Sequence, residues 1–170
     1  MQAKTYTYDA NKYGELFETI LQDVNALHDA PDSARDDKEF MLAVVEEHPG
    51  AVRYASARLR DDEELMSLAV EQDGWFLHDA SPRLRDNKEF IMNAVRASGW
   101  AYAFASDRLK DDEEIAALVA QLHAWGFEYA SERLRGNKKL ALLAMKKNPQ
   151  NYSYLTPEMR HDMDVLALAG

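Results

Sequence analysis

The chain has 170 residues, of which 46% are hydrophobic and 29% charged, the composition of one folded domain rather than a disordered segment. It has no cysteine, which excludes disulfides, thiolate metal sites and a cysteine nucleophile and fits a reducing, cytoplasmic location. Its net charge of −10 argues against direct binding to nucleic acid or to anionic membranes. No apolar run is long enough to span a membrane, and residues 1–15 show no secretory signal.

From residue 35 onward the sequence repeats itself at a constant period, with no insertion between copies. The closing leucines of the first four copies, Leu59, Leu84, Leu109 and Leu134, mark the period. Stacked copies of this size are the signature of a repeat protein. We therefore predict a single repeat domain, residues 1–170, made of a degenerate N-terminal cap (1–34), five repeats of which the last is worn (35–159) and a truncated sixth (160–170).

Each copy is predicted to form a hairpin of two short helices. An aspartate followed three residues later by a glutamate resembles an N-cap with its capping-box partner. A six-residue apolar stretch follows, and glycine or proline then ends the first helix. The second, shorter helix is expected at roughly 75–80 or 100–105, with a recurrent alanine where helices approach closely. The capping pairs are Asp36 and Glu39, Asp61 and Glu64, Asp86 and Glu89, and Asp111 and Glu114.

A hairpin of this length buries its apolar faces only when copies stack in register. The pattern therefore predicts an all-α, right-handed α-solenoid of 25-residue helical-hairpin repeats. The segments DDKEFMLAVVEEHPGAVRYASARL and DNKEFIMNAVRASGWAYAFASDRL resemble the helical-repeat family known as domain of unknown function 4116, over roughly residues 35–159. The fifth copy departs from that pattern at Gly136, Lys139 and Leu155. The resemblance implies a fold and no activity.

Trp75, Trp100 and Trp125 occupy the same position in three successive copies, directly after the expected turn. Two interpretations are open. In one, they form an aromatic strip that binds a peptide or a partner helix, because tryptophan is enriched in interface hot spots. In the other, which we favour, each ring braces its own turn and that of the neighbouring copy, because large aromatic side chains are usually mostly buried.

Arginines form a second row at the penultimate position of each copy. Forked guanidinium groups hold carboxylates or phosphates, so Arg83, Arg108 and Arg133 join the tryptophans as candidate partner-binding residues. In the alternative, which we favour, each arginine pairs with the cap aspartate of the copy that follows, only a few residues later. A third row of basic residues opens the copies: Arg35, Arg60, Arg85, Lys110 and Arg135.

The residues of catalytic and metal chemistry form no known pattern. The five histidines lack metal-ligand spacing, and the Asp-Asp pairs lack the glycine and terminal glutamate of a calcium loop. Serine recurs four times, at 56, 81, 106 and 131, and a repeated hydroxyl at helix ends indicates structure rather than a nucleophile. We therefore expect no enzyme, no cofactor and no metal.

Charge varies from copy to copy more than any other property. Residues 60–84 hold two basic and seven acidic residues, whereas residues 135–159 hold five basic and one acidic. The latter segment carries a basic patch formed by Lys138, Lys139, Lys146 and Lys147. This variation reflects either drift in worn repeats or a functional polarity, and the sequence leaves both open.

Two functions follow as hypotheses. The first is a cytoplasmic, non-enzymatic interaction scaffold that binds a peptide or partner protein along one face of the solenoid. The alternative is an acidic inhibitor that blocks a basic, nucleic-acid-binding groove on another protein. The apolar residues at 165–168 lack a covering second helix, which also predicts a possible homodimer through the C-terminal edge.

Overall fold

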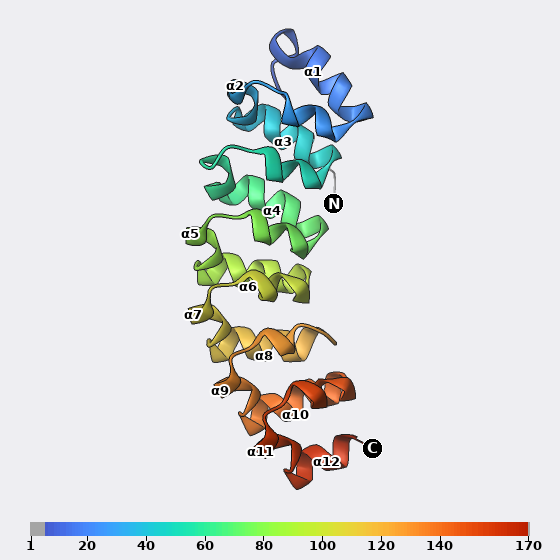
Figure 1. Ribbon diagram of the computed structural model, residues 1–170, viewed down its shortest axis with the longest axis vertical. Helices are drawn as coiled ribbons and strands as arrows, with labels where there is room; N and C mark the ends of the chain where they lie inside the picture. Colours follow the sequence, from blue (N-terminus) through green and yellow to red (C-terminus); the bar gives the residue numbers. More distant parts are fainter. Residues whose placement is uncertain (1–5, 170) are drawn as a thin grey trace. The chain divides into compact units, whose positions relative to one another are not determined.

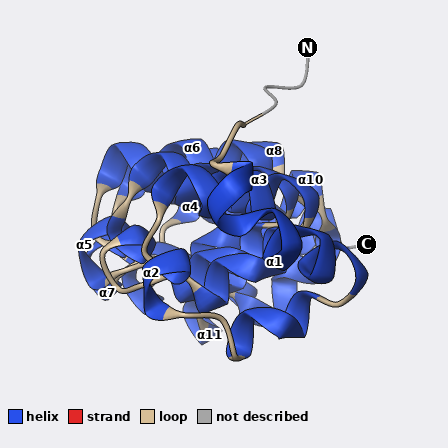
Figure 2. Cartoon of the chain, turned by 90° about the horizontal axis from the view of Figure 1, so that it is seen from above, coloured by secondary structure: helices blue, strands red, loops and turns tan. Residues whose placement is uncertain are grey.

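The computed structural model describes residues 6–169, and Figures 1 and 2 show helices joined by loops throughout that range, without a strand. No helix within residues 6–169 combines the length and the apolar character that crossing a bilayer requires. Contacts divide the chain into two compact units, Met1–Leu84 and Arg85–Gly170. The expectations for residues 1–5 and for Gly170 lie outside the described residues.

Unit 1 is a two-layered stack in which the longer α-helices form one layer and 3₁₀ helices the other. In the first layer α1 packs against α3 and α3 against α4, while in the second η1 packs against η2 and η2 against η4. The elements are α1 (Ala10–Gln22), η1 (Val24–His28), α2 (Asp32–Arg35), α3 (Lys38–Glu47), η2 (Pro49–Tyr54), η3 (Leu59–Asp61), α4 (Glu63–Gln72) and η4 (Gly74–Asp79). A short helix, α5 (Pro82–Arg85), spans the last residues of the unit.

Unit 2 has the same order of elements. The long helices pack in sequence, α6 on α8, α8 on α10 and α10 on α12, and η6 packs against η7. The elements are α6 (Lys88–Ala97), η5 (Gly99–Phe104), α7 (Asp107–Lys110), α8 (Glu113–Leu122), η6 (Phe127–Tyr129), α9 (Glu132–Arg135), α10 (Lys138–Lys147), η7 (Pro149–Tyr154), α11 (Pro157–Arg160) and α12 (Met163–Ala169).

The predicted two-helix hairpin is wrong, because each copy holds three helical elements. After the recurrent alanine the backbone is extended, and the serine that follows begins a new short helix. The Ser106 side chain accepts a hydrogen bond from the amide of Leu109 and so caps α7, and Ser131 caps α9 in the same way. The predicted second helix is a 3₁₀ helix, the form in which single short turns commonly occur.

The predicted N-caps are also wrong, by one residue. The side chain of Asp112 accepts hydrogen bonds from the amides of Glu114 and Ile115 and so caps α8. Glu114 is therefore the second residue of the helix. A capping box needs the glutamate at the third position, so none forms here. Asp37, Asp62, Asn87 and Asn137 cap their helices at the equivalent position.

The N-terminal cap begins with two separate helices, α1 and η1. The side chain of Asp23 accepts a hydrogen bond from the amide of Asn25 and begins η1, which separates it from α1.

The apolar columns that the repeat predicted are buried. The closing leucines are fully buried, and the recurrent alanines are at most 6% exposed. Because an alanine places only one methyl group between neighbouring backbones, this column lets successive elements approach closely. The buried alanines are Ala30, Ala55, Ala80, Ala105 and Ala130, and the leucines are Leu59, Leu84, Leu109 and Leu134.

Candidate interaction surface

The row of arginines is part of a clamp within each copy. The Nε of Arg108 donates to Oδ1 of Asp86 over 3.0 Å, and its Nη2 donates to the Asp86 carbonyl oxygen over 2.7 Å. The Ser106 hydroxyl donates to the same carboxylate. Each arginine therefore pairs with the aspartate near the start of its own copy, and the predicted pairing with the following copy is wrong. The same clamp joins Arg58 to Asp36, Arg83 to Asp61 and Arg133 to Asp111.

This clamp occupies one side of each guanidinium group. Arg83, Arg108 and Arg133 already hold a carboxylate of their own copy, although their side chains remain 55%, 62% and 56% exposed. A partner's carboxylate would therefore have to compete with an internal one. Their proposed part in partner binding stays a prediction.

Because of these clamps, the free energy of unfolding depends on pH in the acidic range. The Ser106 hydroxyl and the Arg108 guanidinium, both donating to Asp86, hold the pKa of that carboxyl below its usual range. The pKa values of Asp36, Asp61 and Asp111 are lowered by the same two partners of their own copies. A carboxyl whose pKa is lower in the folded than in the unfolded chain stabilises the fold above the unfolded value of about 3.9. That contribution is lost as the pH falls through the folded value.

We therefore expect the free energy of unfolding to decrease as the pH is lowered below about 4.5, measured by urea denaturation at several pH values. In the double variant Asp86→Asn and Asp111→Asn the decrease should be smaller, because two of the titrating clamps are gone. An identical acid dependence in the variant and the parent chain would show that the clamps do not carry it.

A second set of charged contacts recurs in every other copy. The Lys88 ammonium lies 2.8 Å from Oδ2 of Asp112 and 2.9 Å from Oε2 of Glu114, and so bridges the starts of α6 and α8. Lys38 bridges Asp62 and Glu64, and Lys138 bridges Asp162 and Asp164, in the same way. Alternate copies therefore differ in their charged contacts. Of the basic patch that the sequence predicted, Lys138 is engaged in this bridge.

The three tryptophans are exposed, which overturns the favoured expectation of burial. Trp75 is 55% exposed, Trp100 45% and Trp125 44%. In the copies that carry Trp75 and Trp100, the glycine before the tryptophan is buried instead. The residue two positions after the tryptophan, Leu77 or Tyr102, fills the core. The Trp100 ring lies 6.2 Å from the ring of Tyr129, centroid to centroid.

The turn that carries Trp125 differs from the others. Here glycine follows tryptophan instead of preceding it, and Gly126 has a φ of +106°, which favours glycine. The 3₁₀ helix therefore starts only at Phe127 and has three residues, whereas η4 and η5 have six. The repeat pattern did not predict this irregular turn, although the sequence shows the exchanged order of tryptophan and glycine.

Neighbouring elements hold the irregular turn on both sides. His123 Nε2 lies 2.6 Å from the carbonyl oxygen of Val95. On the other side Asn148 Nδ2 donates to the carbonyl oxygen of Ala124 over 3.1 Å. A Cβ atom at Gly99 would lie 2.8 Å from His123 and from the carbonyl oxygen of Trp125, so only glycine permits this approach.

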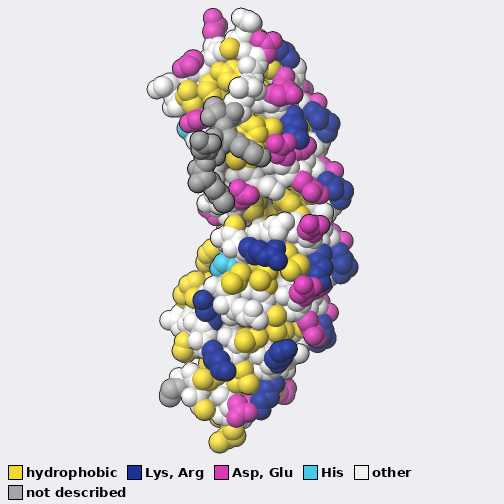
Figure 3. All heavy atoms as spheres, turned by 180° about the vertical axis from the view of Figure 1, so that it is seen from behind, with side chains coloured by type: hydrophobic (Ala, Val, Ile, Leu, Met, Phe, Trp, Pro, Cys, Tyr) yellow, Lys and Arg dark blue, Asp and Glu magenta, His cyan; other side chains and the backbone are white. Residues whose placement is uncertain are grey.

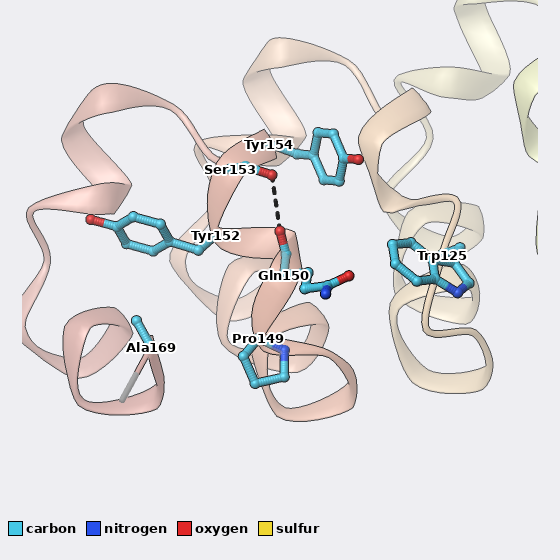
Figure 4. A pocket seen from close by; sticks show the side chains of 7 residues that line it. All are labelled: Trp125, Pro149, Gln150, Tyr152, Ser153, Tyr154 and Ala169. Atoms are coloured by element: carbon cyan, nitrogen blue, oxygen red, sulfur yellow. Dashed lines mark hydrogen bonds between the residues drawn. The ribbon is translucent and has the colours of Figure 1, made fainter.

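Trp125 lines two hollows in unit 2. Figure 4 shows the larger one, of about 460 Å³, in which Trp125 and Tyr154 lie on the same side of the Pro149–Gln150 segment. The Tyr152 side chain points the opposite way, and its hydroxyl donates to the carbonyl oxygen of Arg160 over 3.0 Å. The larger hollow is lined by Trp125, Pro149, Gln150, Tyr152, Ser153, Tyr154 and Ala169, and the smaller, of about 220 Å³, by Ala97, Ser98, Gly99, Trp100, His123, Ala124 and Trp125.

The two units differ in charge. Unit 1 has eight Lys and Arg against eighteen Asp and Glu, and so carries the whole net charge of −10. Unit 2 has twelve of each. Figure 3 shows basic side chains beside apolar ones on one face of unit 2. The chain therefore combines an acidic unit with one that has no net charge, and both carry exposed tryptophans.

Within residues 6–169 no group of three or more histidine, aspartate or glutamate side chains is placed to hold a metal ion. In α12, Met163 is 79% exposed and Leu166 41%, whereas Val165 is fully buried. The homodimer through this end stays a prediction.

These features define an all-helical protein built from tandem repeats. Four overlapping segments, residues 37–85, 62–110, 87–118 and 112–160, match the family described as a domain of unknown function (DUF4116), and the chain belongs to that family. Three of the four matches have the same length, and each of these three covers about two of the copies defined above. Searches of curated proteins and of solved structures give no match.

Proposed function

We propose that this chain is a non-enzymatic, cytoplasmic interaction scaffold that binds a peptide or partner protein through its exposed tryptophans. In this proposal the 25-residue copies stack as a right-handed α-solenoid, and the tryptophan position recurs along one face. The absence of cysteine supports the location. The repeat family supplies no activity, so the argument rests on the site.

The observation that carries the proposal is the exposure of the tryptophans, each between 44% and 55%. Leaving so large an apolar side chain in water forgoes the hydrophobic stabilisation that its burial would provide. Tryptophan is also the residue most enriched in binding hot spots, where a few buried anchors contribute most of the affinity. Three exposed rings at one position of successive copies therefore favour binding over bracing.

The test is affinity capture from the native host with the parent chain and with three variants, Trp75→Ala, Trp100→Ala and Trp125→Ala. We expect at least one variant to lose a partner that the parent retains, while its chain stays folded with a slightly lower thermal unfolding midpoint, because about half of each ring is already exposed. Leu122→Ala, which truncates a side chain that is also 44% exposed, is the matched control. Partners retained by all three folded variants would contradict the proposal.

The charge of unit 1 supports a second candidate, an acidic inhibitor that covers a basic groove of another protein. Salt separates the two functions. Affinity that depends on charge should fall steeply between low and high ionic strength, whereas affinity anchored by tryptophan should change little. Capture at two salt concentrations, with the parent chain and with the tryptophan variants, decides between them, because salt-sensitive capture that all three variants retain supports the acidic inhibitor.

A further inference from the structure

We propose that the larger hollow beside Trp125 binds an extended acidic segment of a partner protein. An apolar side chain of that segment would lie between Trp125 and Tyr154, and its carboxylates would face Lys146 and Lys147. This inference rests on the proposed scaffold function and names the chemistry of the partner.

The shape and lining of the hollow suit an extended peptide. Its floor is the Pro149–Gln150 segment, and the rings of Trp125 and Tyr154 rise on one side of it (Figure 4). Shallow grooves with aromatic walls bind extended segments, whose backbone groups remain unpaired and need partners. The exposed side chain of Gln150 extends into the space beside Trp125 and can both donate to and accept from such a backbone.

The charges close to the hollow favour an acidic segment as its occupant. Lys146 and Lys147 are exposed in the last turn of α10, and neither forms an ion pair with a described residue. Lys147 is two residues from Pro149, so their Cα atoms are at most about 7 Å apart, a distance that an extended lysine side chain can span. The corresponding positions of α8 hold Gln121 and Leu122. This pair of lysines is therefore specific to the copy that forms the hollow.

An acidic ligand meets little opposing charge there. Unit 2 has no net charge, and among residues 6–169 no acidic side chain lines the hollow. One carboxylate opposes an acidic ligand from outside the lining, because Glu128 lies beside Tyr154 and raises the pKa of that phenol through a hydrogen bond and its charge. Aromatic walls also attract cations. Lys146 and Lys147, which precede Pro149 closely in the chain, would repel a cationic segment and so favour the acidic one.

The experiment uses a synthetic nonapeptide in which a Leu-Pro-Leu centre is flanked on each side by three glutamates. A second peptide has lysines as flanks, and a third has glycines at the centre. Binding is followed at low salt on the ¹⁵N-labelled full chain, by the indole N–H signals of its three tryptophans. We expect the acidic peptide to shift the Trp125 signal and to leave the Trp75 signal unchanged.

Variants then separate charge from shape. The double variant Lys146→Gln and Lys147→Gln should weaken binding of the acidic peptide by about threefold to tenfold. Lys139→Gln is the matched control, because it removes an exposed lysine about 10 Å away along the same helix. Trp125→Ala should abolish binding in a chain that stays folded, with at most a small decrease of its unfolding midpoint.

Tighter binding of the lysine-flanked peptide would overturn the inference in favour of a cationic segment. Equal affinity of the double variant and the parent chain would overturn the assigned charge. If no peptide binds while capture from the host still depends on Trp125, this inference fails and the scaffold function stands. If capture does not depend on any tryptophan either, both fail.

Discussion

The variant Leu109→Ala should lower the free energy of unfolding by about 2–5 kcal/mol, the range measured when a buried leucine is truncated in a rigid core. Leu109 is fully buried and lies at the end of its copy, in the short helix α7, which packs against α8. Truncation removes the transfer free energy of three carbon atoms and leaves a cavity that a stack of short helices can fill only in part. Urea denaturation followed by circular dichroism measures the loss.

The control for this variant is Leu122→Ala, the same substitution at a leucine that is 44% exposed at the end of α8. We expect it to lower the free energy of unfolding by about 1 kcal/mol or less, because a large part of its apolar surface is already in water and no closed cavity forms. Equal losses in the two variants would mean that Leu109 is not a core residue, and that the column of closing leucines does not form part of the core.

What the sequence predicted well is the set of properties that all copies share. Ala105 and Leu109 recur at fixed positions, and both are buried because the same neighbours surround them in every copy. The glycine or proline near residues 50, 74 and 99 likewise separates an α-helix from the element after it. A periodic pattern averages over copies, so it is sensitive to the contacts that each copy makes with the next.

What the sequence did not predict depends on choices between adjacent polar residues. Asp111 and Asp112 both suit an N-cap, and only the backbone geometry decides that Asp112 caps α8 while Asp111 accepts from Ser131 and Arg133. The resulting clamp joins the start of a copy to its end, whereas sequence reasoning favoured partners close along the chain. The sequence spacing therefore predicted correctly that each arginine pairs with an aspartate, but it predicted the wrong aspartate.

The candidate site was predicted in part. The tryptophans were identified by their spacing, but their exposure depends on whether the ring or its neighbour enters the core. In the copy of Trp100, it is Tyr102 that enters the core. Tyr102 is fully buried, and its hydroxyl donates to the carbonyl oxygen of Lys110 over 2.8 Å. The hollow beside Trp125 lies where one copy departs from the common pattern. A periodic pattern contains only what the copies share, so it does not predict a feature of one copy.

The variant Gly126→Ala tests that departure and should lower the free energy of unfolding by about 2–4 kcal/mol. Two costs combine at this position. A residue with a Cβ atom is strained at a φ of +106°, and the added Cβ would lie 2.7 Å from the carbonyl oxygen of Gly99. The urea midpoint measures the loss, and the indole signal of Trp125 should shift because the turn must rearrange.

The matched control is Gly14→Ala, which should have the opposite sign. Gly14 lies inside α1, and a Cβ atom there would meet nothing closer than Ala10 at 4.0 Å, so alanine should stabilise the helix by about 0.5–1 kcal/mol. A Gly126→Ala chain as stable as the parent would show that the turn does not adopt the left-handed conformation. In that case the hollow beside Trp125, and the peptide site proposed there, would lose their structural basis.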